Sequence, residues 1–192
     1  GGVRSGKSRL AERLASEAGQ NVTYVATMEP LDGEVQERIR IHRERRPPHW
    51  ITVEEPLAVA EAVSRHGESA DAGIVDCLGL FVTNILLSQN DDMPYSERCD
   101  EALDRVKALA RAASHAVAKV IVVSNEVGWG VVPESLLGRL FRDALGLANQ
   151  ALAELAEQVF LTVAGIPVEL KSLEHRTAAV RSSSLPKSFL GE

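Results

Sequence analysis

Short apolar runs alternate with longer amphipathic stretches along the chain. The runs are rich in β-branched residues and bounded by polar ones, which predicts strands over residues 21–27, 49–54, 73–77 and 119–124. Apolar residues that recur every three or four positions predict a helix beginning near Ser8 and helices over residues 56–65, 80–87, 96–118 and 136–158. This alternation predicts an α/β fold with an open, mostly parallel sheet and helices on both faces.

The C-terminal part departs from this alternation. Residues 159–164 and 168–171 are short apolar runs on either side of Gly165, Ile166 and Pro167, and they predict a hairpin. Residues 172–192 show no periodic apolar face, so we expect a tail that lies on the surface or is disordered. We therefore expect one domain over residues 1–171, followed by that tail.

Composition narrows the class of protein. A chain of 192 residues suits one domain, and 45% hydrophobic with only 4% aromatic residues implies a core of Val, Leu, Ile and Ala, as in helices packed on a parallel sheet. The net charge of −6 argues against nucleic-acid or membrane-surface binding. The two cysteines, Cys77 and Cys99, make neither a disulfide framework nor a metal motif. No membrane-spanning stretch or signal peptide is visible, so we expect a cytoplasmic enzyme.

The first eight residues carry the strongest motif. They read GGVRSGKS, which matches the phosphate-binding pattern G-x-x-x-x-G-K-[ST] and precedes an amphipathic run. Lys7 would supply positive charge to the β- and γ-phosphates, and Ser8 a hydroxyl to Mg²⁺. The predicted phosphate-binding residues are Gly1, Gly2, Val3, Arg4, Ser5, Gly6, Lys7 and Ser8. The alternative is a Gly-rich turn that fits the pattern by chance. Such a loop follows a buried strand, so we expect a Val/Ile/Leu-rich strand before Gly1.

Polar residues follow two of the predicted strands. Asp76 ends the apolar run GIVD, where enzymes with this loop hold the acid that organises Mg²⁺. The alternative is an Asp that caps the next turn. Asn125 and Glu126 end the strand KVIVVS in the same way. Because strand tips converge on one crevice in this architecture, the sequence predicts a shared site there.

The segment over residues 38–56 is the second distinctive feature. His42 lies among several arginines, and nearby positive charge favours a neutral imidazole and attracts phosphates. A neutral histidine beside bound phosphates is able to attack an α-phosphorus and carry a nucleotidyl group. The alternative is a solvated helix face, because Glu34, Glu37 and Glu44 offset much of the charge. The residues alone leave both interpretations open.

Several motifs occur together in one order. The blocks YVAT, RIRIHRERRPPHWITVEEP, VDCLGLFVTN, SNEVGWGVVPES and GRLFRDALGLANQALAE follow GGVRSGKS. Together they resemble the bifunctional adenosylcobinamide kinase / adenosylcobinamide-phosphate guanylyltransferase family of cobalamin biosynthesis, from Gly1 to about Lys171. The phosphate-binding loop is generic, whereas the H-R-x-x-R-P-x-x-W-x-T-x-E block and N-E-V-G-x-G-x-V-P are specific.

The resemblance implies a reaction in two halves. ATP or GTP phosphorylates the hydroxyl of adenosylcobinamide; GTP then guanylylates a histidine, and GMP passes to adenosylcobinamide phosphate, giving adenosylcobinamide-GDP. That histidine corresponds to His42, which follows Ile41 where some members carry a second histidine. It also implies a RecA-like core, a homotrimer and Mg²⁺. Beyond the loop, the implied nucleotide contacts are Ala26, Thr27, Met28, Arg43, Glu44, Arg45, Arg46, Glu54 and Asp76.

Two other functions remain possible at this level. One is a kinase of another small metabolite that uses the same loop, with the Arg/His segment as a lid. The other is a RecA-like ATPase module that works through a protein partner or DNA. The acidic composition counts against the DNA version.

Overall fold

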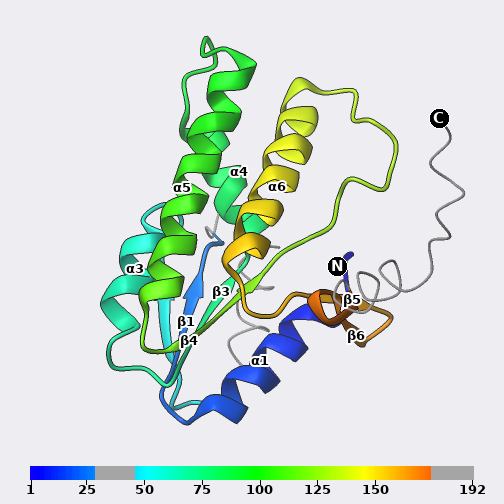
Figure 1. Ribbon diagram of the computed structural model, residues 1–192. Coiled ribbons are helices and arrows are strands. Elements are labelled where there is room, and N and C mark those ends of the chain that lie inside the picture. Colours follow the sequence, from blue (N-terminus) through cyan, green and yellow to red (C-terminus); the bar gives the residue numbers. More distant parts are fainter. Residues whose placement is uncertain (29–45, 174–192) are drawn as a thin grey trace, which may run out of the picture.

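The central sheet is parallel, as the sequence predicts. The computed structural model describes residues 1–28 and 46–173. Its sheet has the strand order β2–β1–β3–β4, with every neighbouring pair parallel (Figure 1). The strands are β1 (Val22–Ala26), β2 (Ile51–Glu54), β3 (Ala72–Asp76) and β4 (Lys119–Val123). β2 begins later than expected because the Trp50 N–H donates to the Pro47 carbonyl in a turn.

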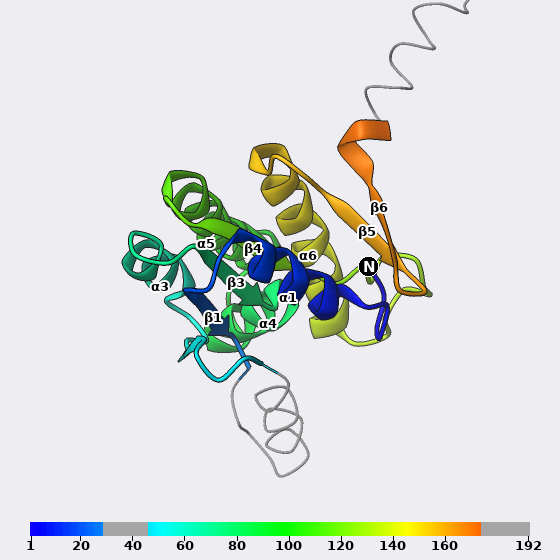
Figure 2. The same ribbon diagram turned by 90° about the horizontal axis from the view of Figure 1, so that it is seen from below.

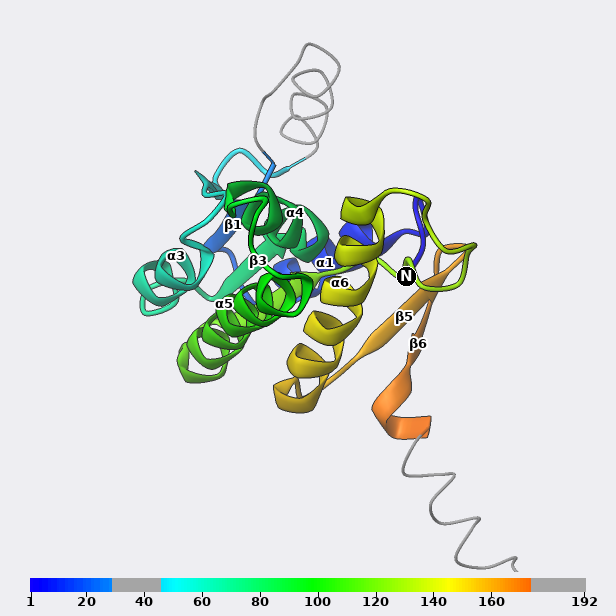
Figure 3. The same cartoon turned by 90° about the horizontal axis from the view of Figure 1, so that it is seen from above.

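Helices cover both faces of this sheet, which confirms the α/β expectation. Helix α1 (Lys7–Ala18) lies on one face, where Ala11 and Ala15 pack with Val22, Tyr24 and Ile74. The other face carries the larger core. Figures 2 and 3 show the remaining helices on that side of the sheet. These helices are α3 (Val59–His66), α4 (Leu78–Ser88), α5 (Tyr95–His115) and α6 (Leu136–Leu155).

Three helix ends differ from the prediction by three residues, for local reasons. α3 begins at Val59 rather than at Pro56, because the Glu55 carboxylate accepts the N–H groups of Leu57 and Ala58 in a preceding turn. α5 ends at His115 and α6 at Leu155, because the residue after each, Ala116 or Ala156, turns to extended backbone. The first part of the segment over residues 38–56, up to residue 45, lies outside the described residues, so the helix face considered there is not tested.

The predicted C-terminal hairpin is present, but its turn is not where the sequence suggested. Strands β5 (Phe160–Val163) and β6 (Ile166–Glu169) pair antiparallel around Ala164 and Gly165, whose φ angles are 51° and 82°. Positive φ at both central positions is the hairpin geometry that matches strand twist. Ile166 and Pro167 therefore belong to β6. Residues 170–173 are helical rather than strand. Residues 174–192 of the predicted tail lie outside the described part of the chain.

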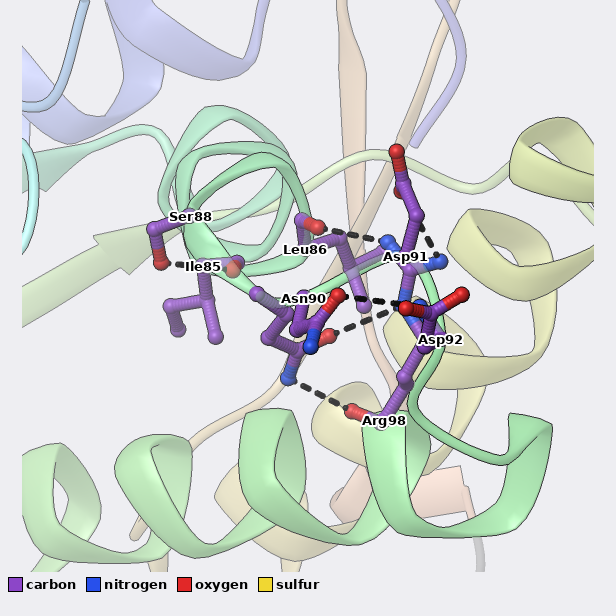
Figure 4. Close-up of polar contacts among 8 residues, drawn as sticks. Ile85, Leu86, Ser88, Asn90, Asp91, Asp92 and Arg98 are labelled. Atoms are coloured by element: carbon purple, nitrogen blue, oxygen red, sulfur yellow. Dashed lines mark hydrogen bonds and ion pairs between the residues drawn. The ribbon is translucent and has the colours of Figure 1, made fainter.

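A buried arginine fixes the connection between α4 and α5. Arg98 Nη2 donates to the Leu86 carbonyl at 2.8 Å, Nε donates to Gln89 Oε1 at 3.2 Å, and Nη1 lies 3.5 Å from Asp91 Oδ1 (Figure 4). These contacts turn the chain back, so α5 packs along α6. Among the described helices, none combines the length and apolar character that a membrane crossing requires.

Candidate active site

The GGVRSGKS segment forms a tight loop that ends in a helix N-terminus. Gly6 has φ 99°, in the left-handed region, and Lys7 begins α1 directly after it. A Cβ at Gly6 would lie 3.2 Å from the Gly165 Cα, so the site favours glycine on conformation and on space. A helix N-terminus directs unpaired N–H groups and a positive partial charge outward, which suits an anion. The expected loop-to-helix geometry is present.

Two other elements hold this loop in place. The Ser5 carbonyl accepts the Gly165 N–H at 2.9 Å, which joins the loop to the β5–β6 turn. The Gly1 carbonyl accepts the Glu126 N–H at 3.1 Å, which joins it to the segment after β4. Figure 3 shows the N-terminus beside the hairpin. Ser5 is buried, whereas Gly2, Val3 and Arg4 are exposed and face solvent.

Lys7 lies near Asp76, the acid at the end of β3. Its Nζ donates to the Gly2 carbonyl at 2.6 Å, so the side chain folds over the loop. Partial burial lowers the pKa of Lys7, while the Cys77 thiol and the Asp76 carboxylate act to raise it. The Lys7 ammonium therefore has the Asp76 carboxylate as an anionic neighbour. Both lie at the edge of the sheet toward which the N-terminus of α1 points.

The register of the sheet puts three predicted residues in one row. Ala26 pairs with Glu54 on one side and with Asp76 on the other, at the carboxyl ends of β1, β2 and β3. Ser8, in the first turn of α1, is half-buried. Parallel strands bring their carboxyl ends to one edge, and ligands bind there in open α/β sheets.

Thr27 proves to be a structural residue of this edge. It is fully buried, and its Oγ1 donates to the Cys77 carbonyl and accepts the Cys77 N–H, both at 2.8 Å. Its own N–H donates to the Asp76 carbonyl, and its carbonyl accepts from Asn84 Nδ2. Each polar group of Thr27 already has a partner. A nucleotide contact from this stretch therefore fits Ala26 or Met28, which are half-buried, better than Thr27.

Arg46 is the described end of the Arg/His segment. Its guanidinium lies 3.4 Å from the centroid of the Tyr24 ring, and Nη1 donates to Thr52 Oγ1 at 3.2 Å. His42, Arg43, Glu44 and Arg45 lie outside the described residues, so their predicted roles stay predictions.

Sequence reasoning missed two residues that organise the edge. Tyr24 donates its hydroxyl to Asp76 Oδ2 at 2.6 Å. Asn149 of α6 accepts from the Ser124 hydroxyl at 2.5 Å and donates to the Asn125 carbonyl at 3.1 Å, which fixes the segment after β4. The available signals were weak: Tyr24 stands two positions before Ala26 on the same face of β1, and Asn149 interrupts an apolar face of α6.

The residues at this edge fit a magnesium ion held with a nucleotide. Mg²⁺ binds through one or two protein oxygens, with phosphates and water completing its shell. Asp76 uses Oδ2 for Tyr24, and Oδ1 takes no hydrogen bond from a described residue. Within residues 1–28 and 46–173, no group of three His, Cys, Asp or Glu side chains is placed to hold a metal alone. Asp76 and Ser8 are thus suitable partial ligands.

A phosphate-binding loop before a helix, beside an acid at the tip of a parallel strand, defines a P-loop nucleotide-binding enzyme. Residues 1–170 match the CobU family, described as cobinamide kinase / cobinamide phosphate guanyltransferase, and the chain belongs to that family. It is 47% identical over 171 residues to the bifunctional adenosylcobalamin biosynthesis protein CobP of Pseudomonas aeruginosa, covering 89% of this chain and 94% of the relative. It is 41% identical over 176 residues to CobU of Escherichia coli, which bears the same description, covering 89% and 97%.

Family membership confirms the resemblance drawn from the motifs. The chain is an enzyme of cobalamin biosynthesis with kinase and guanylyltransferase activities toward cobinamide substrates. This decides against the two alternatives, a kinase of another metabolite and a RecA-like ATPase module. Nucleoside triphosphates are the substrates that both activities require.

Proposed function

We propose that Lys7 and Asp76 serve phosphoryl transfer and that His42 carries the guanylyl group. The observation that supports the first part is the convergence of the Lys7 ammonium, the α1 N-terminus and the Asp76 carboxylate on one edge. Phosphoryl transfer depends chiefly on positioning and on charge stabilisation. The loop amides would hold the triphosphate, and Lys7 would stabilise charge that develops on the β- and γ-phosphate oxygens.

In the first half-reaction, the hydroxyl oxygen of adenosylcobinamide attacks the γ-phosphorus of ATP or GTP. The bond to the β–γ bridging oxygen breaks, the nucleoside diphosphate leaves, and the hydroxyl proton passes to water. Ser8 and Asp76 would hold Mg²⁺, which when bound neutralises charge on the β- and γ-phosphates. Partial burial makes Lys7 a stronger electrostatic partner, because its charge is less screened by water.

In the second half-reaction, a ring nitrogen of His42 attacks the α-phosphorus of GTP, and pyrophosphate leaves. The phosphate of adenosylcobinamide phosphate then attacks the same phosphorus and displaces the imidazole. The sequence places Arg43, Arg45 and Arg46 next to His42, where guanidinium groups suit the pyrophosphate leaving group.

Covalent labelling tests the histidine. The protein is incubated with Mg²⁺ and GTP labelled at the α-phosphate, denatured, and examined for label that is acid-labile and alkali-stable, as in a phosphoramidate. Wild-type protein should carry label that adenosylcobinamide phosphate removes, and His42→Ala should carry none. His49→Ala is the matched control, because His49 lies in the same segment and should leave labelling intact. Label that persists in His42→Ala would refute the assignment.

A kinase assay tests the loop. With label at the γ-phosphate, Lys7→Ala should transfer phosphate to adenosylcobinamide with kcat/KM lowered on the order of 10²–10³-fold, the effect of losing one preorganised charge partner. Arg9→Ala, two residues along α1 on an exposed position, is the control. Near-normal turnover in Lys7→Ala would count against the role of the loop.

The assembly and location follow as further parts of this proposal. A homotrimer predicts a particle of three times the 20.7 kDa chain mass, which light scattering measures directly. A cytoplasmic location fits an enzyme that consumes ATP and GTP.

A further inference from the structure

Tyr24 is buried under the proposed nucleotide site and faces α1. It is the third residue of β1, with 2% of its surface exposed, and packs in the cluster that includes Ala11 and Ala15. Its hydroxyl is its only polar side-chain group, and it donates to Asp76 Oδ2 at 2.6 Å. Buried tyrosine hydroxyls need a partner, and this one has a carboxylate.

The hydroxyl of Tyr24 is the donor of this hydrogen bond. Its oxygen lies 2.6 Å from Asp76 Oδ2, and the carboxylate oxygen accepts. A charge-assisted bond of this length restricts the orientation of the carboxyl group. Asp76 Oδ1 then has a fixed position at the sheet edge.

The ring of Tyr24 has a second partner. The Arg46 guanidinium lies over it at 3.4 Å from the centroid, in the geometry of a cation–π contact. Arg46 also donates to Thr52 Oγ1, and Thr52 is the register partner of Tyr24 on β2. The Arg46 Nε is buried and finds no hydrogen-bond partner among the described residues. Among the described residues, the Tyr24 ring and the Thr52 hydroxyl are the two contacts of this guanidinium, and the ring covers its face.

One side chain therefore contacts both parts of the proposed machinery. We infer that Tyr24 is a positioning residue for both half-reactions: its hydroxyl orients Asp76 for Mg²⁺, and its ring anchors Arg46 at the base of the segment that carries His42. The inference rests on the proposed roles of Asp76 and His42. It assigns Tyr24 no contact with substrate.

A measurement of nucleotide affinity distinguishes the role of the Tyr24 hydroxyl from a general effect on folding. The dissociation constant of a non-hydrolysable GTP analogue, guanosine 5′-(β,γ-imido)triphosphate, is measured by calorimetry with saturating Mg²⁺ and with EDTA. Tyr24→Phe removes only the hydroxyl. It should leave the affinity in EDTA unchanged and reduce the Mg²⁺-dependent gain about 10–100-fold, the usual effect of losing a partner that orients a metal ligand.

The chain offers a matched control in its other tyrosine. Tyr95 also donates its hydroxyl to a carboxylate, Asp143 Oδ2 at 2.8 Å, between α5 and α6. Tyr95→Phe should leave both affinities unchanged. If wild-type protein shows a gain from Mg²⁺ and Tyr24→Phe keeps all of it, the inference is wrong. If wild-type protein shows no gain, the proposed metal role of Asp76 fails instead.

The ring is tested by labelling at saturating Mg²⁺ and saturating GTP, where a weaker affinity no longer limits the rate. Tyr24→Phe keeps the ring and should label from α-labelled GTP at the wild-type rate, whereas Tyr24→Leu should label at least tenfold more slowly. Arg46→Gln removes the cation without touching the core and should match Tyr24→Leu. Wild-type labelling in both of these variants would overturn the role of the ring. A wild-type protein that takes no label would instead contradict the role of His42.

Discussion

Thr27→Val tests whether the edge depends on one buried hydroxyl. Valine has nearly the same shape, so the change removes the two hydrogen bonds of Thr27 Oγ1 with little change in packing. The Cys77 carbonyl keeps a second donor, the Phe81 N–H at 3.1 Å. The Cys77 N–H keeps none among the described residues. The substitution therefore leaves the Cys77 N–H without a partner in the described part of the chain and removes one of the two hydrogen bonds that the Cys77 carbonyl accepts.

These two losses set the expected magnitude. A buried donor left without a partner costs about 1–3 kcal/mol, and the lost hydroxyl–carbonyl bond about 1 kcal/mol. Together they should lower the free energy of unfolding by about 2–4 kcal/mol. In a chain of this size each kcal/mol shifts Tm by about 2–4 °C, so Tm should fall by about 4–16 °C. That is a large part of the stability of a typical domain.

Thermal and urea unfolding measure the effect, with Thr83→Val as the control. The Thr83 hydroxyl donates to the Gly79 carbonyl at 2.9 Å within α4, where that carbonyl also accepts the helical N–H. Thr83→Val should therefore cost less than about 1 kcal/mol. If Thr27→Val is no more destabilising than Thr83→Val, the hydroxyl does not hold the tips of β1 and β3 together.

Three further predictions concern other parts of the fold. Gly6→Ala should lower nucleotide affinity and stability by about 1–2 kcal/mol, because its φ of 99° is strained for alanine; calorimetry and unfolding measure both. Arg98→Met should lower the free energy of unfolding by about 2–4 kcal/mol, because it leaves the Leu86 carbonyl without this donor, while the kinase rate per folded molecule stays unchanged. Burial of the hydroxyl, followed by its hydrogen bond to Asp143 and the charge of that carboxylate, raises the folded pKa of Tyr95 to about 12 from 10.0. Its stabilisation relative to Tyr95→Phe should be complete below pH 10 and should disappear as pH rises through 12.

The strands and the phosphate-binding loop could be predicted because their signals are local. An apolar run between polar residues specifies a strand, and the loop motif fixes glycines where positive φ is needed, as Gly6 illustrates. The position of the hairpin turn was predicted wrongly for the opposite reason. Ala164 adopts φ 51°, which alanine rarely does, so its sequence carried no sign that it would form half of a two-residue turn.

The location of the candidate site in the fold could be predicted from the sequence, but most of its individual contacts could not. The polar residues after two predicted strands, at Asp76 and at Asn125, indicated a shared edge, and β3 and β4 do end side by side because they are parallel. The sequence pattern could not predict that the Thr27 hydroxyl would hydrogen-bond to Cys77, or that the Arg46 guanidinium would stack on the Tyr24 ring. Such contacts join residues distant in sequence, and they depend on the register and on side-chain directions that only the packed sheet determines.

Register is also the reason that the chemistry of this edge depends on its apolar core. Tyr24 pairs with Ile74, and Asp76 lies two residues further along β3, so the two side chains share the α1 face as diagonal neighbours. A slip of one residue would send one of them to the opposite face. Val25 and Val75 pack in the larger apolar core on the other face, and a slip would bring the Asp76 carboxylate into that core, which is costly. The hydrogen bond that orients Asp76 is thus maintained by valines that never contact the site.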